Sequence, residues 1–218
     1  MNNKDKVLTI KQQVYQIIKD DICKGVYEPG QQINEVELSN RLGISRSPIR
    51  ESLRQLVSDG LCVELPNRGV FVKEFSIDEI NNIYDYRLLL ESYAIEHCSH
   101  NINEKMIKAL ESCKEALAQF HKDNDLNSYI DEDTTLHQTI VDLCGNSIII
   151  DAYERVSSMN SQFRIYSLTD QKRFDESIQE HTDIIDNILK GNYQEAIEMN
   201  RLHLFKAKDT ITKTLSDY

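Results

Sequence analysis

The chain has 218 residues, 40% of them hydrophobic and 28% charged, with only 7 Gly and 3 Pro and a formal net charge of −11. This composition predicts a helix-rich globular protein of one large or two smaller domains, and it excludes disordered, collagen-like and turn-rich β architectures. No run approaches the roughly 20 apolar residues of a membrane span, and residues 1–13 lack the apolar core of a signal peptide. Five scattered cysteines without a C-x-x-C pair are expected to be reduced. We therefore expect a cytoplasmic protein with no membrane partner.

The charge is distributed unevenly along the chain. Residues 1–75 carry 11 Lys and Arg against 10 Asp and Glu, whereas residues 76–218 carry 14 against 26. Charge acts locally, so the acidic total does not exclude a nucleic-acid partner for the first segment. We therefore interpret the two segments separately.

The first segment is predicted to form three helices and a β-hairpin. Apolar periodicity predicts the helices at residues 10–22, 35–42 and 45–59. A glycine closes each of them, as is typical of helix ends. Two short runs rich in β-branched and aromatic residues, 61–65 and 69–73, predict the two strands of a wing. Together these elements predict a winged helix-turn-helix.

From Ser76 onward almost every residue is predicted to be helical. Ser76 can cap the first helix, because Glu79 stands three residues later, where its side chain can reach back to the cap. Helices are expected at about 77–99, 103–122, 126–144, 147–167, 172–190 and 193–215. We expect an antiparallel bundle of six or seven helices, so the predicted fold class is mostly α.

Basic residues line one face of the third predicted helix. They are spaced four residues apart and lie opposite its apolar stripe: Arg46, Arg50 and Arg54. Arginine can bond two acceptors of guanine or clamp a phosphate, and Ser45 and Ser47 can donate to backbone oxygens. Arg68 at the wing tip is placed to enter a minor groove. The alternative is a solvated face whose arginines pair with acids such as Glu51.

Residues 37–72 closely resemble the N-terminal domain of GntR-superfamily transcription regulators. Its core E-L-x-x-x-L-G-x-S-R-x-P-x-R-E-x-L-x-x-L precedes a wing with R-G-x-F-V, and the run here is ELSNRLGISRSPIRESLRQLVSDGLCVELPNRGVFV. The resemblance covers about residues 8–74 and implies DNA contacts by Ser45, Arg46, Ser47, Arg50, Arg68 and Gly69. Many relatives carry a basic residue early in the second helix, where this chain has Glu35, Val36 and Glu37. We expect no phosphate or base contact there.

Four candidate metal ligands are spread over three predicted helices of the second segment. Asp133 and His137 are four residues apart, which turns both side chains toward one side of a helix. His181 and His203 lie within or next to the apolar periodicity of two later helices, so antiparallel packing can bring both imidazoles to one cavity. The alternative for each histidine is a hydrogen-bonded core position. Surface or helix-end positions are expected for the other three: His97, His100 and His121.

The second segment resembles the FCD effector domain of the FadR branch of the same superfamily, over about residues 76–215. The match runs through R-L-L-L-E at 87–91, D-x-x-x-H followed by G-N at 145–146, then E-H and H-L. In that branch an Asp and three His commonly hold a divalent metal, and the resemblance assigns those roles to Asp133, His137, His181 and His203. Such nitrogen-rich ligation favours Zn²⁺, with Ni²⁺ as an alternative, over Mg²⁺ and Ca²⁺. Arg87 either binds an effector carboxylate or forms a buried salt bridge to Glu91.

These features predict a one-component transcription regulator, and more specifically a repressor. Residues 1–75 are expected to bind a palindromic operator as part of a homodimer. Residues 76–218 are expected to dimerise and to bind a small organic acid at the metal site. The alternatives are a metal-dependent enzyme and a regulator that responds to metal alone. Because the sequence shows no separate nucleophile or general-base motif, we expect no enzymatic activity.

Overall fold

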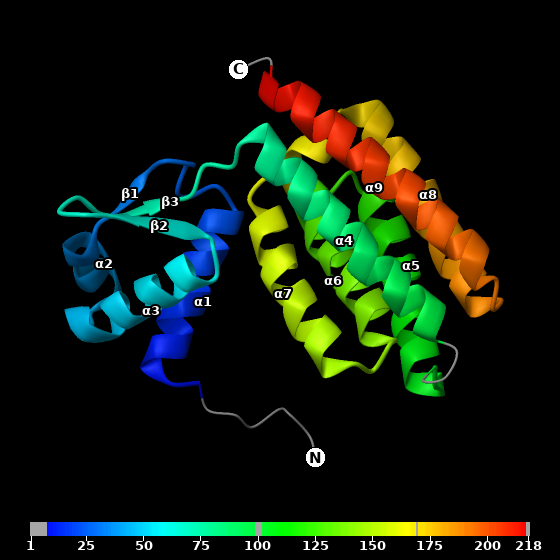
Figure 1. Ribbon diagram of the computed structural model, residues 1–218, viewed down its shortest axis with the longest axis horizontal. Coiled ribbons are helices and arrows are strands. Elements are labelled where there is room, and N and C mark those ends of the chain that lie inside the picture. The colour runs from blue at the N-terminus through cyan, green and yellow to red at the C-terminus, as the bar shows by residue number, and fades with distance from the viewer. Residues whose placement is uncertain (1–7, 99–101, 169, 217–218) are drawn as a thin grey trace. The chain divides into compact units, whose positions relative to one another are not determined.

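The computed structural model describes residues 8–98, 102–168 and 170–216 (Figure 1). The chain divides into two compact units, residues 1–75 and 76–218. His100, which the sequence places at a surface or helix end, lies outside the described residues. In the described part of the chain, no helix combines the length and the apolar character that a membrane span requires.

The first unit packs three helices against a small sheet. The helices are α1 (Ile10–Cys23), α2 (Glu35–Leu42) and α3 (Arg46–Ser58). The strands are β1 (Gln32–Ile33), β2 (Cys62–Leu65) and β3 (Gly69–Val72). They pair antiparallel in the order β1-β3-β2, and the tight connection from β2 to β3 forms the predicted wing. Strand β1 was not predicted, because two residues are too few to show an alternating pattern.

Local sequence fixes where the helices of this unit begin and end. The Asn34 side chain accepts hydrogen bonds from the backbone N–H groups of Val36 and Glu37, which satisfies the open N-terminus of α2. Gly43 ends α2 with φ +66°, a left-handed conformation that favours glycine. On α3, Ile49 and Leu56 are fully buried in the core of the unit. Packing therefore holds α3 by its apolar side, and its arginines face outward.

The second unit is a helical bundle. Its helices are α4 (Ile77–His97), α5 (Glu104–Lys122), α6 (Leu126–Asp142), α7 (Ser147–Ser161), α8 (Gln171–Leu189) and α9 (Tyr193–Ser216). Helix α4 packs along α9, α5 along α6, and α8 along α9 (Figure 1). The mostly α fold class, with a winged helix-turn-helix followed by a bundle, is confirmed.

One predicted helix is interrupted. The sequence predicts a single helix over 147–167, but α7 ends at Ser161 and a 3₁₀ helix, η3 (Arg164–Ser167), follows. No glycine or proline marks this break in the sequence. The change of direction accompanies burial of Arg164, which is 2% exposed and contacts Asp133 on α6. A contact between distant segments, rather than local sequence, therefore marks the end of α7.

The interior of the bundle contains a polar layer beside its apolar core. The core includes Leu117, Leu136 and Ile184, all fully buried. Among the buried polar side chains are Arg87, Glu91, Asp133, His137, Arg164, His181, Asn200 and His203. Burying charged groups is costly unless they are paired or bind a ligand. The polar layer is therefore where a functional site of the bundle is expected.

Candidate metal centre and nucleic-acid interface

The four candidate metal ligands meet inside the bundle. Asp133 and His137 lie on α6, His181 on α8 and His203 on α9. One possible ligand atom from each residue lies within 4.8 Å of the others. All four residues are buried, with at most 5% of their surface exposed. The fold therefore brings together all four residues to which the resemblance assigned metal binding.

Each imidazole of this cluster is held through Nδ1 by a group outside it. The contacts are His137 to Glu91 Oε2 at 2.9 Å, His181 to Tyr129 Oη at 3.0 Å, and His203 to Glu180 Oε2 at 2.9 Å. Metal-binding histidines usually engage the second ring nitrogen in this way, which fixes the ring and its tautomer. The sequence did not single out these outer partners.

The Nε2 atoms of the cluster, on the side of each ring opposite these outer contacts, also indicate a bound ligand. Nε2 of His137 and Nε2 of His181 are buried and make no hydrogen bond with the described residues. His181 Nε2 lies 2.9 Å from Asp133 Oδ1, but without hydrogen-bond geometry. A buried polar atom without a hydrogen bond is costly, and a cation among these atoms would remove that cost. Three imidazole nitrogens and one carboxylate oxygen therefore fit a borderline divalent metal.

The charge states of the cluster also suit a cation. Burial and the neighbouring His181 lower the pKa of His203 to about 3, and burial lowers the pKa of His181. Burial opposes ionisation of Asp133, yet Arg164 and the two nearest histidines hold the pKa of its carboxyl well below its ordinary value. For His137 the influence of Glu91 outweighs burial and raises the pKa. Two neutral imidazoles and a carboxylate are ready to bind a cation, and His137 would lose its proton to solvent when a metal binds.

Arg164 contacts the carboxylate of the cluster from η3. Its Nη1 donates to Asp133 Oδ2 at 2.5 Å and to Thr134 Oγ1 at 2.8 Å. Asp133 Oδ1 then faces His181. Sequence reasoning missed Arg164, because nothing in its local pattern shows that η3 lies against α6. Its position fixes the orientation of the Asp133 carboxylate.

Arg87 forms the buried salt bridge that was one of its two predicted roles. Its Nε donates to Glu91 Oε1 at 3.1 Å, and both side chains are almost fully buried. Glu91 also accepts from Tyr153 Oη at 2.9 Å and from Asn200 Nδ2 at 3.0 Å. The same carboxylate contacts His137, so Glu91 connects Arg87 to the four-residue cluster.

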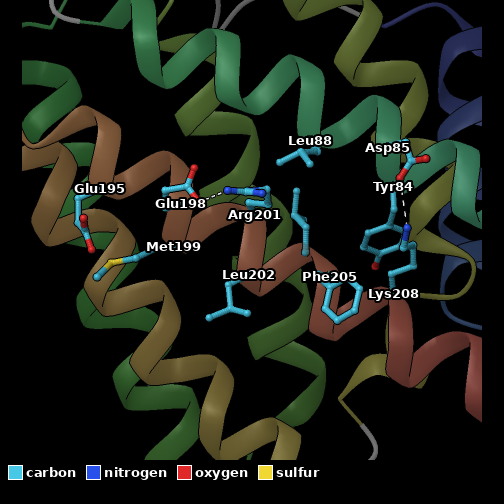
Figure 2. A pocket seen from close by; sticks show the side chains of 11 residues that line it. Tyr84, Asp85, Leu88, Glu195, Glu198, Met199, Arg201, Leu202, Phe205 and Lys208 are labelled. Atoms are coloured by element: carbon cyan, nitrogen blue, oxygen red, sulfur yellow. Dashed lines mark hydrogen bonds and ion pairs between the residues drawn. The ribbon is translucent and has the colours of Figure 1, made fainter.

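A groove of about 660 Å³ lies between α4 and α9, apart from the four-residue cluster (Figure 2). Leu202 and Phe205 line it and are 54% and 60% exposed. Four of its charged residues form two ion pairs, Glu198 with Arg201 and Asp85 with Lys208, drawn as dashed lines in Figure 2. The sequence did not predict this groove, because the spacing of apolar residues along α9 does not show which of them are buried and which are exposed.

The predicted DNA-contact residues are all exposed in the first unit. Ser45 and Ser47 lie at the start of α3, and Ser45 makes no capping hydrogen bond with its side chain. Arg68 lies at the wing tip, with its guanidinium 5.4 Å from the centre of the Phe71 ring. The wing is tied to β1, because Gln32 Nε2 donates to the Arg68 carbonyl oxygen at 2.6 Å. Gly69 adopts φ +92°, which allows the turn.

Two arginines of α3 pair with an acid that the sequence analysis did not name as their partner. Glu35 Oε2 accepts from Arg46 Nη2 at 2.9 Å and from Arg50 Nε at 2.8 Å. The suggested partner Glu51 forms no ion pair with the described arginines of α3. Arg54 is exposed and forms no ion pair within the described ranges. Pairing with an acid therefore occurs for two of these arginines, through Glu35 rather than through Glu51.

Family comparisons decide the class of protein. The profile of bacterial regulatory proteins of the gntR family matches residues 10–72, and the FCD domain profile matches residues 82–206, more than half of the chain. The chain belongs to the GntR family of regulators with an FCD domain. The family membership predicted from the sequence is confirmed, and the matching families and relatives are transcription regulators rather than enzymes.

Individual relatives extend over most of this GntR-family chain. The HTH-type transcriptional regulator YdhC of Bacillus subtilis is 29% identical over 193 residues, which are 88% of this chain and 86% of that protein. The gluconate operon transcriptional repressor of Bacillus subtilis is 28% identical over 166 residues, 76% of this chain and 67% of that protein. A solved GntR regulator from Rhodococcus sp. RHA1 superimposes with a TM-score of 0.80 at 22% identity, covering 95% of this chain and 98% of that one. These matches support the fold and the regulator class.

Proposed function

We propose that this GntR-family regulator is a homodimeric repressor whose affinity for a palindromic operator is controlled by a small carboxylate bound at a metal ion. Residues 1–75 bind the DNA, and residues 76–218 bind the effector and dimerise. The observation that carries the effector half is the cluster of three histidines, each held at Nδ1 from outside, around Asp133. The observation that supports the DNA half is the exposed arginine face of α3 beside the wing.

Asp133, His137, His181 and His203 would hold the metal, with Zn²⁺ as the first choice and Ni²⁺ as the alternative. A bound metal supplies a Lewis acid that attracts a carboxylate oxygen at any position the protein leaves open. The protein's own contribution is orientation. Glu91, Tyr129 and Glu180 fix the three rings, and Arg164 fixes the carboxylate.

Arg87 connects an anionic effector to the cluster in this proposal. Its guanidinium is paired with Glu91, and Glu91 also holds His137. An effector carboxylate beside Arg87 would compete with Glu91 for the guanidinium and so change the support of His137. A coupling of about 1–3 kcal/mol between effector and operator is enough for regulation. One relative is named for repression of the gluconate operon, and gluconate is a carboxylate, which supports this effector class.

Operator binding depends on the exposed side chains of α3. Arg50→Ala is expected to weaken binding to a duplex selected from a randomised library by the wild-type protein, by about 1–3 kcal/mol. Fluorescence anisotropy at fixed salt measures this change. Arg41→Ala is the matched control, because Arg41 is an exposed arginine of the same unit that pairs with Asp21 on α1. Equal losses in both variants would contradict a specific role for Arg50.

Metal affinity depends on the groups that hold the imidazoles. Tyr129→Phe removes the hydroxyl that contacts His181 Nδ1, and we expect about 10- to 100-fold weaker Zn²⁺ binding. Competition with a chromophoric chelator measures the dissociation constant. Tyr86→Phe, at a half-exposed position on α4, is the control. A Zn²⁺ dissociation constant within twofold of the wild-type value would show that Tyr129 does not support metal binding.

One preparation tests the whole proposal. Elemental analysis of the purified protein, paired with native mass spectrometry, reports metal content, a retained acid and the dimer. Operator affinity is then measured with metal alone and with metal plus candidate organic acids. A change with metal alone would favour a metal-responsive regulator, and no response to either would leave only the DNA half of the proposal standing.

A further inference from the structure

Glu35 lies at the first position of α2 and faces the arginine stripe of α3. One of its oxygens accepts hydrogen bonds from both Arg46 and Arg50. The Glu35 side chain is 28% exposed, whereas the two arginine side chains are 50% and 51% exposed. The Glu35 side chain is therefore less exposed than the two arginine side chains that it contacts. The capped N-terminus of α2 holds it there, and the helix dipole favours its charge.

This contact constrains how Arg50 can meet DNA. Arg50 uses Nε for Glu35, so this contact does not use its two terminal amino groups. A pair of parallel donors matches O6 and N7 of guanine. Arg46 is engaged through Nη2 at the same oxygen. Both guanidinium groups are thus oriented before DNA arrives.

The same contact lowers the attraction of the stripe for phosphate. Together, Glu35, Arg46 and Arg50 carry a net charge of +1 instead of the +2 of two unpaired arginines. A phosphate must compete with the Glu35 carboxylate for these guanidinium groups, whereas a base edge carries no net charge and gains directed hydrogen bonds. Nonspecific affinity depends mainly on phosphate neutralisation, and specificity depends on base contacts.

We propose that Glu35 is a specificity-determining residue, which orients Arg46 and Arg50 toward base edges and suppresses their binding to phosphates of nonspecific DNA. This inference rests on the proposed DNA-binding function. It assigns a role to the acidic start of α2, where the sequence comparison led us to expect no contact with DNA. Glu35 acts through the arginines and is a positioning residue.

The test compares Glu35→Gln with Glu37→Gln in the full-length protein. Both changes remove one negative charge from the first turn of α2, but Glu37 is exposed and pairs with no described arginine. The probes are the duplex selected by the wild-type protein and a shuffled duplex of equal length, titrated over a range of salt concentrations. For Glu35→Gln we expect about three- to tenfold tighter binding to the shuffled duplex, and a salt slope steeper by about 1. If binding to the selected duplex does not tighten, the ratio of selected to shuffled affinity should fall at least about threefold, and Glu37→Gln should change it less than twofold.

Three outcomes would overturn the inference. A Glu35→Gln ratio within twofold of wild type shows that the contact does not determine specificity. Equal changes of this ratio in Glu35→Gln and Glu37→Gln show that the effect comes from the loss of a negative charge and not from the contact with the arginines. Failure of the wild-type protein to select any sequence would overturn the DNA-binding function and this inference together. Arg50→Ala distinguishes failure of this inference from failure of the DNA-binding function. If Arg50→Ala weakens binding to the selected duplex while Glu35→Gln leaves the ratio of selected to shuffled affinity unchanged, only the role of Glu35 is rejected. Thermal unfolding of both glutamine variants verifies that α2 is intact.

Discussion

His181→Ala is expected to abolish tight Zn²⁺ binding while operator binding without effector stays within about threefold of wild type. His181 is fully buried and contacts Asp133 and Tyr129, so the substitution removes one of the three imidazoles of the cluster. For the wild-type protein, Zn²⁺ at 100 times its dissociation constant should stabilise the folded state by about 2.7 kcal/mol. That corresponds to a rise in melting temperature of about 5–10 °C. The variant should show no rise.

The control for this experiment is His121→Ala. His121 lies on α5, contacts Asp175 and is not part of the cluster, so its loss should leave the Zn²⁺ response intact. Thermal unfolding without metal is measured for both variants, because His181→Ala also leaves a cavity in the bundle. A full Zn²⁺ shift in His181→Ala would show that the stabilising metal binds elsewhere. Loss of operator binding in the metal-free variant would show that the cluster supports the DNA-binding state itself.

The sequence predicted the elements best where each boundary has its own local signal. Helix α2 begins and ends at its predicted residues, because Asn34 caps it and Gly43 closes it. The break between α7 and η3 had no such signal, since the burial of Arg164 against Asp133 depends on packing between residues that are 31 positions apart in the chain. Local capping is readable from a sequence, whereas this kind of tertiary contact is not.

The candidate sites show the same division. The spacing of Asp133 and His137, together with the family resemblance, was sufficient to name four residues that the fold brings together. Their outer partners depend on how α4, α6, α8 and α9 face one another, which no spacing within one helix reveals. Glu35 is a similar case. Its position before α3 in the sequence does not show that it reaches two arginines 11 and 15 residues later.

The second large effect is expected at Glu91. Glu91→Gln keeps the shape of the side chain but leaves Arg87 charged and buried without an ionised partner. Breaking a buried pair from one side typically costs about 3–5 kcal/mol. Urea unfolding of the full-length protein, followed through the transition of the bundle, measures the loss. Glu198→Gln is the control, because its partner Arg201 is on the surface, and we expect a change below about 0.5 kcal/mol.

The double variant Arg87→Met/Glu91→Gln identifies the origin of that cost. If the buried charge of Arg87 is responsible, removing it should recover at least about 1 kcal/mol of the loss. No recovery would place the cost in the other partners of Glu91, such as Tyr153 and Asn200. Full recovery of the wild-type stability would show that the ion pair is not required for folding. In that case the pair is available for the proposed control by an effector, because Glu91 also contacts His137 of the four-residue cluster.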